Sequence, residues 1–464
     1  MRQHVPVDGA GAGCAPSQRR LPLRRGRALK PELVVAREAG AALADLLLAA
    51  PRQAWALLAR RARLARFRAL RHDAPPPPGA ASPPPRPLRR VLLSCGDASG
   101  ENHALRLVET LRRRHPGLQA AGFGGARLAA AGVEVWEPLA DLNVMGFRDV
   151  AARLPLFFRC VARFARELQQ RPPDAAVLVD YPGLNRHLLR VAAHARVPVV
   201  DYIAPQLWAW APWRVRDFRR ADRLLTILPF ERDWYARAGA AAVYVGHPLG
   251  DGLAAAAAEE AAPPQLDPRF RWVGILPGSR RREIQENLPA LLAAAGELAA
   301  RRPDVRFVLP HLRASVWPLL HEHLRAAAVE VTPAPGSYHG VLAQLQAAWV
   351  ASGTALLEVA AHGVPPVLVY GLSSAVAAWG ARHALAVPYV GSLNLLAGEE
   401  LAPEHVGRSL DPRALADDLE ARLEGPRRAQ VLASIARLRP HFAVPGAAER
   451  AARAVEEAAA AAPA

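Results

Sequence analysis

Two glycine-containing loops in the second half of the chain carry groups that are suited to binding a phosphate. The first, Gly278-Ser279-Arg280, follows an apolar run and precedes the start of a helix; the second, Ser352-Gly353-Thr354, also opens a helix, with Glu358 one turn farther on. Helix N-termini attract anions through unpaired N–H groups and the macrodipole, and a guanidinium group matches phosphate oxygens. Together the loops predict a diphosphate held between helix ends, with Glu358 near a sugar hydroxyl. Two ordinary strand-to-helix turns are the alternative.

Three acidic residues in the first half are candidates for proton transfer. Asp180 follows the apolar run 175–179, so we expect it at the tip of a buried strand that faces a cleft. An apolar flank raises the pKa of a carboxyl group, which suits a base that takes the proton of an attacking hydroxyl. Capping of the following Pro-Gly turn is the alternative role. Asp97 and Glu101, in the loop GDASGE, are rival candidates that could instead cap the next helix.

The composition narrows the kinds of site that the chain can hold. The three cysteines lie far apart, no His/Cys cluster has metal-ligand spacing, and no Asp-x-Asp pair is present, so we expect no metal and no cofactor. No apolar run reaches the length of a transmembrane helix, and the first residues lack a signal-peptide pattern. Arginine replaces lysine almost everywhere, which we attribute to genome composition, and no nucleic-acid partner is predicted.

The positive charge is concentrated near the N-terminus. Residues 1–90 carry 18 Lys or Arg against five Asp or Glu, whereas the rest of the chain is nearly balanced. Apolar residues at helical spacing predict a helix over 31–72, followed by a Pro-rich linker from Pro75 to Pro87. A basic amphipathic helix can lie on an anionic membrane, and a solvated extension is the alternative. We expect residues 1–86 to serve membrane attachment and to be dispensable for folding and chemistry.

Beyond the linker, short apolar strands alternate with helices, which is typical of parallel βαβ units. The expected strands of the first half are 91–95, 118–125, 133–136, 175–179, 197–203, 224–228 and 242–245; those of the second half are 272–276, 306–309, 329–332, 348–350 and 367–370. We therefore predict an α/β fold of two doubly wound Rossmann-like domains facing a cleft. The expected units are a basic extension (1–86), a first Rossmann-like domain (87–255), a second Rossmann-like domain (256–430) and a helical tail (431–464). Ligands of such sheets bind outside the carboxyl ends of the strands.

Ten motifs in order carry a resemblance to a known family. They are GDASGE (96–101), GFGGARLAAAGVEVW (122–136), NVMGF (143–147), VDYPGLN (179–185), APQLWAW (204–210), LPFERDWY (228–235), GHPLGD (246–251), ILPGSRRREI (275–284), SGTALLE (352–358) and SLNLLAGEEL (392–401). From about residue 90 to residue 425 the chain resembles the lipid-A-disaccharide synthases, which are glycosyltransferases of the B-type (GT-B) fold.

The resemblance implies a reaction and its substrates. The family transfers 2,3-diacylglucosamine from UDP to lipid X, the 1-phosphate of the same sugar, and releases UDP. The product is the β-1,6-linked disaccharide 1-phosphate; the transfer is inverting and needs no metal. The family works as a peripheral protein on the cytoplasmic, inner face of the inner membrane, so an anionic membrane surface is an expected partner. A homodimer is kept open as the assembly state.

The resemblance also assigns residues. Arg280 and the loop Ser352-Gly353-Thr354 would hold the UDP diphosphate, Glu358 the ribose, and Asn394 would lie near the nucleotide. Asp180 matches the family's essential aspartate. Departures fall near the expected donor pocket: Asp97 and Glu101 exchange the family's two carboxylates, and Tyr370-Gly371 stands where Tyr-Arg is common.

Two further readings stay open. The chain could be a membrane-docked nucleotide-sugar-binding protein that lacks this activity, or another UDP-sugar transferase or epimerase of the same fold. Two apolar segments could hold acyl chains at a membrane surface or could belong to the core. They are the aromatic set Trp208, Trp210, Trp213 and Phe218, and the run 154–158 between Arg153 and Arg159.

Overall fold

Short runs of apolar residues form two entirely parallel sheets in the computed structural model, which describes residues 30–70, 86–142, 153–259, 262–351 and 353–461. The first sheet has the strand order β3-β2-β1-β4-β5-β6-β7 and the second has the order β10-β9-β8-β11-β12-β13. The first seven strands are β1 (Arg90–Ser94), β2 (Gln119–Phe123), β3 (Glu134–Glu137), β4 (Ala175–Val179), β5 (Val199–Tyr202), β6 (Arg223–Thr226) and β7 (Ala242–Tyr244). The other six are β8 (Arg271–Leu276), β9 (Val305–His311), β10 (Val331–Pro335), β11 (Ala347–Ala351), β12 (Pro366–Gly371) and β13 (Glu404–Gly407). The predicted pair of doubly wound domains is confirmed, with β13 as a strand that the pattern did not predict.

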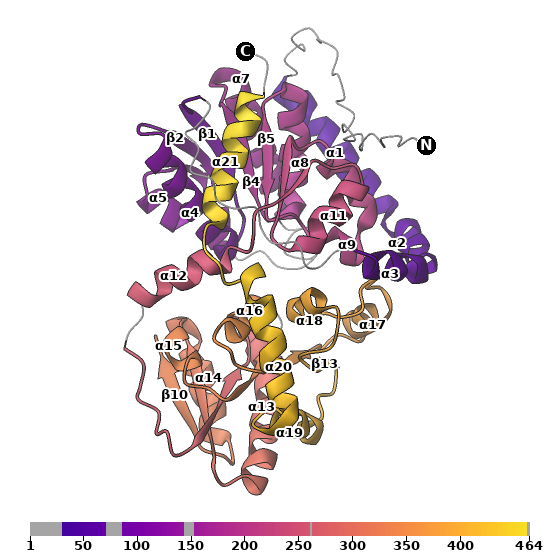
Figure 1. Cartoon of the computed structure of the whole chain (residues 1–464). Coiled ribbons are helices and arrows are strands. Elements are labelled where there is room, and N and C mark those ends of the chain that lie inside the picture. The colour runs from indigo at the N-terminus through magenta and orange to yellow at the C-terminus, as the bar shows by residue number, and fades with distance from the viewer. Residues whose placement is uncertain (1–29, 71–85, 143–152, 260–261, 352, 462–464) are drawn as a thin grey trace, which may run out of the picture.

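Helices cover both faces of each sheet (Figure 1). Those of the first domain are α4 (Ala98–Arg114), α5 (Ala126–Ala130), α7 (Leu154–Gln170), α8 (Pro182–Ala195), α9 (Leu207–Trp210), α10 (Val215–Phe218) and α11 (Pro229–Arg237). Those of the second are α13 (Arg281–Arg301), α14 (Trp317–Ala326), α15 (His339–Leu342), α16 (Thr354–Ala361), α17 (Ala375–His383), α18 (Ser392–Ala397), α19 (Pro412–Glu420) and α20 (Gly425–Leu438). The described residues also form the 3₁₀ turns η1 (Leu139–Asp141), η2 (Pro212–Arg214), η3 (Ala314–Val316) and η4 (Arg439–His441).

The chain passes between the two domains twice. Helix α12 (Leu249–Glu259) leads from the first domain toward the second, and α21 (Ala447–Ala460) runs back across the first domain, in yellow in Figure 1. Ala451 and Val455 of α21 belong to the same apolar cluster as Val91 of the first sheet. The last helix therefore belongs to the first domain and is not a separate tail. The expected boundaries after residues 255 and 430 fall inside α12 and α20.

The carboxyl ends of the strands of each sheet lie along the edge that faces the other domain. Helix α9 follows β5, and the carbonyl of Ala209 accepts a hydrogen bond of 3.0 Å from the N–H of Ala386 in the second domain. Loops that follow strands therefore approach one another across the domain junction, which is where open parallel sheets bind ligands.

The N-terminal helices pack against the first domain. They are α1 (Pro31–Leu47), α2 (Ala49–Leu58) and α3 (Arg60–Arg68). Val34, Phe67 and Leu70 are buried in the core cluster of that domain. The ring of Phe67 lies 5.5 Å from that of Trp208 and 5.1 Å from that of Phe230. We therefore revise the expectation that residues 1–86 are dispensable for folding, because removing them would expose this core.

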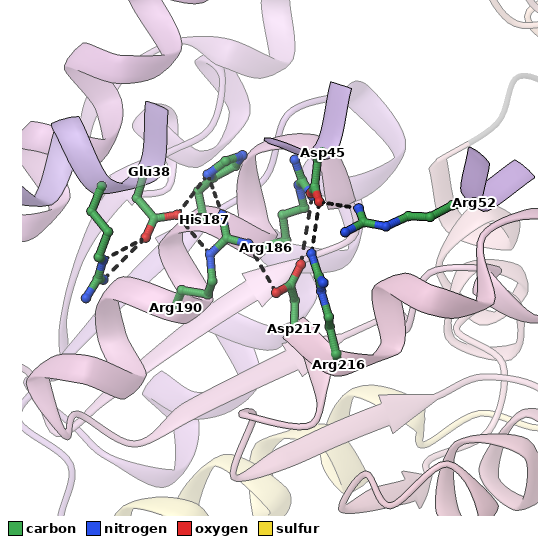
Figure 2. A network of polar contacts seen from close by, with 9 residues as sticks. Glu38, Asp45, Arg52, Arg186, His187, Arg190, Arg216 and Asp217 are labelled. Carbon is green, nitrogen blue, oxygen red and sulfur yellow. Dashed lines mark hydrogen bonds and ion pairs between the residues drawn. The ribbon is translucent and has the colours of Figure 1, made fainter. Parts of the chain in front are cut away.

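A buried ion network fastens α1 to α8 and α10 (Figure 2). Glu38 is 1% exposed and accepts hydrogen bonds from His187 (3.0 Å) and Arg190 (2.6 Å) of α8. Farther along α1, Asp45 pairs with Arg52, Arg186 and Arg216. Burial alone would raise the pKa of Glu38, but its hydrogen bonds and the Arg190 charge outweigh burial and hold the pKa at about 2. The network fixes which face of α1 turns inward.

Substitution of Phe67 by alanine should show that α3 is part of the core. Phe67→Ala should lower the free energy of unfolding by about 3–5 kcal/mol, as truncation of buried aromatic residues does. Leu58→Ala is the matched control, because Leu58 is 87% exposed. Denaturant titration of both variants measures the difference, and equal stabilities would show that α3 is not packed as described.

The ion network predicts a dependence of stability on pH. A carboxyl whose pKa is lower in the folded than in the unfolded state stabilises above its unfolded pKa, and this contribution is lost as the pH falls. Glu38→Gln should cost about 3–5 kcal/mol near neutral pH, since it leaves buried arginine charge unpaired. The difference from the parent should shrink from pH 5 toward pH 2. Glu32→Gln on the exposed side of α1 is the control, and a deficit that does not change with pH would contradict the ionic role.

Candidate active site

Two loops at the carboxyl ends of β1 and β4 meet in the first domain. Asp97 begins α4, and its Oδ1 accepts the N–H of Gly100 at 2.7 Å. The ring of Tyr181 covers Gly96 so closely that a Cβ atom there would lie 2.2 Å from a ring carbon. Glycine at position 96 is therefore required by the approach of this ring.

Asp180 and Tyr181 form a strained turn at the tip of β4. Their φ angles are +50° and +49°, a left-handed conformation that non-glycine residues seldom adopt. Asn185 stabilises the turn by donating to the carbonyl of Asp180 at 2.6 Å, and its Oδ1 accepts the hydroxyl of Ser94 at 2.6 Å. Asp180 is thus placed at the strand tip, as predicted. Asn185 was missed, although its place in VDYPGLN was visible.

The surroundings of Asp180 suit it to accept a proton near neutral pH. Burial raises the pKa of its carboxyl group to about 6, and the nearby charge of Asp97 acts in the same direction. Behind it on β5, Asp201 is 1% exposed and neither carboxyl oxygen has a hydrogen-bond partner among the described residues. Burial, reinforced by the charge of Asp180, raises the pKa of Asp201 well above its usual range. Sequence reasoning missed this second acid.

Glu101 differs from the other two candidate acids. Its side chain is 3% exposed, and Oε1 accepts the N–H of Leu128 in α5 at 3.0 Å. The carboxylate therefore ties α4 to α5 behind the loop. This contact favours the structural alternative for Glu101, whereas the Asp97 side chain stays half-buried at the start of α4.

In the second domain, the loop after β8 is held by residues that the sequence did not single out. Glu283 accepts the N–H groups of Ser279 (2.9 Å) and Arg280 (3.3 Å) through Oε2, and the Arg280 guanidinium through Oε1 (2.9 Å). Gly278 has a φ of +116°, and its carbonyl lies 3.2 Å from Nε2 of His311. Because Glu283 already uses two loop N–H groups, the half-exposed Arg280 side chain is the part of this loop that is best placed for an anion.

The second predicted phosphate loop opens α16. Gly353 precedes this helix with a φ of +130° and no atom within 4 Å of where a Cβ would stand. Thr354 is exposed, and Glu358 follows one turn later on the same side, half-buried. Ser352 lies outside the described residues. The N-terminus of α16 therefore presents open space at the carboxyl end of β11, as an anion site requires.

Asn394 is buried and its amide is fully used by the protein. Nδ2 donates to the carbonyl of Ala402 (2.6 Å) and to Glu404 (2.9 Å), while Oδ1 accepts the N–H groups of Leu401 and Ala402. This arrangement leaves no hydrogen-bonding group of the Asn394 side chain for a nucleotide. Glu404 in turn accepts the N–H of Gly391 at 2.8 Å, so Asn394 helps to place the start of α18.

The apolar segments that could hold acyl chains divide between core and surface. Trp208 and Phe218 are buried in the first domain, whereas Trp210 is 39% exposed and stacks with Arg214. At the start of α7, Leu154 is exposed, and the ring of Phe157 lies 6.4 Å from that of Tyr181. The run 154–158 therefore lies beside the Asp180 turn. The motif NVMGF lies outside the described residues.

Other features of the described chain do not point to a second chemistry. A cavity of about 680 Å³ is lined by α12, α15 and the C-terminal end of α16, away from the N-terminus of α16. Within the described ranges, no three His, Cys, Asp or Glu side chains come together as metal ligands would. No helix in the part of the chain that the structure describes is long and apolar enough to cross a membrane.

The contact between Tyr181 and Gly96 is testable by a single methyl group. Gly96→Ala should push Tyr181 out of place and lower the free energy of unfolding by about 1–3 kcal/mol, the usual cost of overpacking. Gly183→Ala in α8 is the matched control, because no atom lies within 4 Å of a Cβ there. Thermal unfolding of both variants measures the effect; equal melting temperatures would contradict the described ring position.

Comparison with known proteins places the chain in a family. The model of the family described as Lipid-A-disaccharide synthetase matches residues 91–453. A lipid-A-disaccharide synthase of Myxococcus xanthus is 36% identical over 380 residues, covering 79% of this chain and 97% of the relative. One from Koribacter versatilis is 38% identical over 384 residues, with the same two coverages.

Solved structures agree with the fold. The calicheamicin glycosyltransferase CalG4 has a TM-score of 0.51 at 19% identity and covers 80% of this chain and 98% of its own. A complex of MnaA with UDP from S. aureus also has a TM-score of 0.51, at 12% identity, covering 78% of this chain and 94% of its own. At these identities the likeness concerns the fold alone.

Proposed function

Because the chain belongs to the lipid-A-disaccharide synthase family, we propose that its cleft binds UDP-2,3-diacylglucosamine and lipid X and joins the two sugars. The chain is a glycosyltransferase of lipid A biosynthesis. The proposed products are UDP and the β-1,6-linked disaccharide 1-phosphate. The reaction is proposed to proceed at the inner face of the inner membrane, and a homodimer remains a proposal for the assembly state.

Asp180 carries most of the support for the proposed chemistry. Its carboxyl group stands at a strand tip with its pKa raised to about 6, where it is largely ionised at neutral pH yet able to accept a proton. In an inverting transfer, Asp180 takes the proton of the acceptor's 6-hydroxyl as that oxygen attacks the anomeric carbon. The bond from this carbon to the UDP oxygen breaks on the opposite face, and its electron pair leaves with UDP.

Groups of the second domain are proposed to hold the donor. The Arg280 guanidinium and the N-terminus of α16 at Gly353 and Thr354 would stabilise the negative charge on the leaving diphosphate. Gly278 and Ser279 shape the loop that presents Arg280, and Glu358 would accept a ribose hydroxyl. Asn394 is proposed as a positioning residue, since its amide is fully used within the protein.

The first domain is proposed to hold the acceptor. Asp97 interacts electrostatically with Asp180 and lies on the neighbouring loop, so it is positioned to orient a sugar hydroxyl. Glu101 would act through the loop that it braces. The partly exposed apolar side chains of Leu154, Leu156 and Phe157 lie beside this turn and would contact an acyl chain.

Asp180→Asn should separate catalysis from folding. The amide keeps the shape of the carboxyl group but cannot take the proton, so turnover should fall by about 10²–10⁴-fold. UDP affinity and melting temperature should stay near those of the parent. The assay supplies UDP-2,3-diacylglucosamine and lipid X and measures the release of UDP and the disaccharide 1-phosphate.

Other outcomes of this assay would change the role proposed for Asp180 or for the protein. Near-normal turnover of Asp180→Asn would move the base to Asp97 or Glu101, and unfolding would favour a purely structural turn. A parent protein that binds UDP but makes no disaccharide would instead be a nucleotide-sugar-binding protein.

Arg280→Ala should weaken UDP binding. Loss of a hydrogen bond to a charged group costs about 1.5–3 kcal/mol, so the dissociation constant should rise at least tenfold. Its half-exposed pair with Glu283 contributes only about 0–1 kcal/mol to stability, so unfolding should change little. Arg325→Ala on the exposed surface of α14 is the control in isothermal titration with UDP. Unchanged affinity of Arg280→Ala would remove this residue from the site.

A further inference from the structure

The first two helices of the chain expose an unusual set of large apolar side chains. Leu46, Leu47 and Leu58 are 68%, 70% and 87% exposed, and Trp55 is 62% exposed. Leu43 and Leu48 are exposed beside them. We call these six residues the α1–α2 face. Isolated surface leucines are common, but a contiguous apolar face marks a site of interaction.

Charged side chains on these helices are turned away from the α1–α2 face. Between residues 41 and 59 the only charged residues are Asp45 and Arg52, which pair with each other at 2.7 Å within the ion network. Figure 2 shows both directed toward α8 and α10. With Val34 buried on the inner side, α1 cannot turn over to hide its leucines. The exposure is thus fixed by the tertiary structure.

We propose that the α1–α2 face inserts into the interfacial layer of an anionic lipid bilayer and anchors the enzyme there. This inference rests on the proposed function, because both substrates carry acyl chains that reside in a membrane. The helices lie outside residues 91–453, which the family model covers, so the anchor is a feature of this chain's N-terminal addition. Apolar side chains bordered by basic ones are the pattern of helices that lie in the plane of a membrane.

Exposed arginines beside the α1–α2 face supply positive charge, which complements the negative charge of an anionic lipid surface. Arg61, Arg66 and Arg68 follow it directly on α3, and all three are exposed. Near an anionic surface each basic residue is attracted to the lipid headgroups. A second copy of this chain is a poorer occupant, because a two-fold contact through this face would bring these arginines toward their own counterparts.

The anchor adjoins the junction between the domains. Arg60 of α3 donates to the carbonyl of Leu385 in the second domain at 2.9 Å, and Arg63 contacts the carbonyl of Ala209 at 3.4 Å. Helix α17, which ends just before Leu385, carries Trp379 with 53% exposure. In Figure 1, α2, α3 and α17 all lie on the right side of the molecule. A bilayer on this side would lie beside the junction between the domains, where the acyl sugars are proposed to bind.

Charge introduced into the face should release the protein from vesicles. The double variant Leu47→Glu, Leu58→Glu should bind vesicles of phosphatidylglycerol and phosphatidylethanolamine at least tenfold more weakly than the full-length parent in co-sedimentation. Leu312→Glu is the matched control, because Leu312 is 53% exposed on the second domain. The melting temperature and the turnover of short-chain, water-soluble substrates should remain those of the parent.

A second measurement uses a fluorescent label and introduces no charge into the α1–α2 face. In a Cys14→Ser background, an environment-sensitive fluorophore on Leu47→Cys should shift to the blue when anionic vesicles are added, and the same probe on Leu312→Cys should not. Cys95 and Cys160 are buried and would stay unlabelled.

The outcomes distinguish the possible occupants. Unchanged vesicle affinity of the double glutamate variant, or no blue shift at residue 47, would overturn the anchor. Light scattering without vesicles tests the alternative of a second copy. If the parent is a dimer and the double glutamate variant is a monomer, the face binds a second copy of this chain and the anchor is overturned as well. If the parent binds vesicles through this face but forms no disaccharide, the anchor stands and the proposed function fails.

Discussion

The amide of Asn185 is the contact on which the first half of the site depends. Its Nδ2 lies within 3.2 Å of the carbonyl of Val179 and 2.6 Å of that of Asp180, and its Oδ1 accepts the hydroxyl of Ser94. One buried side chain thus joins the ends of β1 and β4 to the start of α8. Together with the hydrogen bond from the N–H of Asp180 to the carbonyl of Tyr202 (2.9 Å), these contacts offset the strain of two consecutive left-handed residues. This amide therefore helps to hold the Asp180 carboxyl group in the place where burial raises its pKa.

In the second domain, too, a buried amide side chain joins loops that follow different strands. Asn287 donates to the carbonyl of Pro277 at 2.9 Å and accepts the N–H of Gly371 at 2.7 Å, joining the loop after β8 to the end of β12. A Cβ atom at Gly371 would lie 2.8 Å from the carbonyl oxygen of Glu286. Buried polar side chains usually find hydrogen-bond partners, and Asn185 and Asn287 each join two or more segments of the chain at once. Loops without regular structure thereby become rigid enough to orient substrates.

Strand positions and the Asp180 tip could be predicted because they depend on local pattern. A buried parallel strand is a short apolar run, and the residue after it lies at the carboxyl edge of the sheet. β13 was missed because Glu404 and His405 interrupt its apolar pattern. The roles of Asn185, Glu283 and Asn394 could not be read in advance, since each depends on backbone groups that only the folded chain brings near. Periodicity identified the N-terminal helix, which the structure divides into three, but not the surface on which its inner side rests. That surface is formed by α7, α8 and α10, more than a hundred residues later.

The return of α21 to the first sheet has a consequence for biosynthesis. Ala451, Ala452 and Val455 fill part of the core that Val91 and Val177 begin. On a ribosome, the first seven strands emerge long before these residues do. At about 5–20 residues per second, the intervening second domain takes on the order of ten seconds or more to synthesise. During that time one face of the first sheet lacks α21, so part of the core of the nascent first domain stays exposed to chaperones until α21 has emerged.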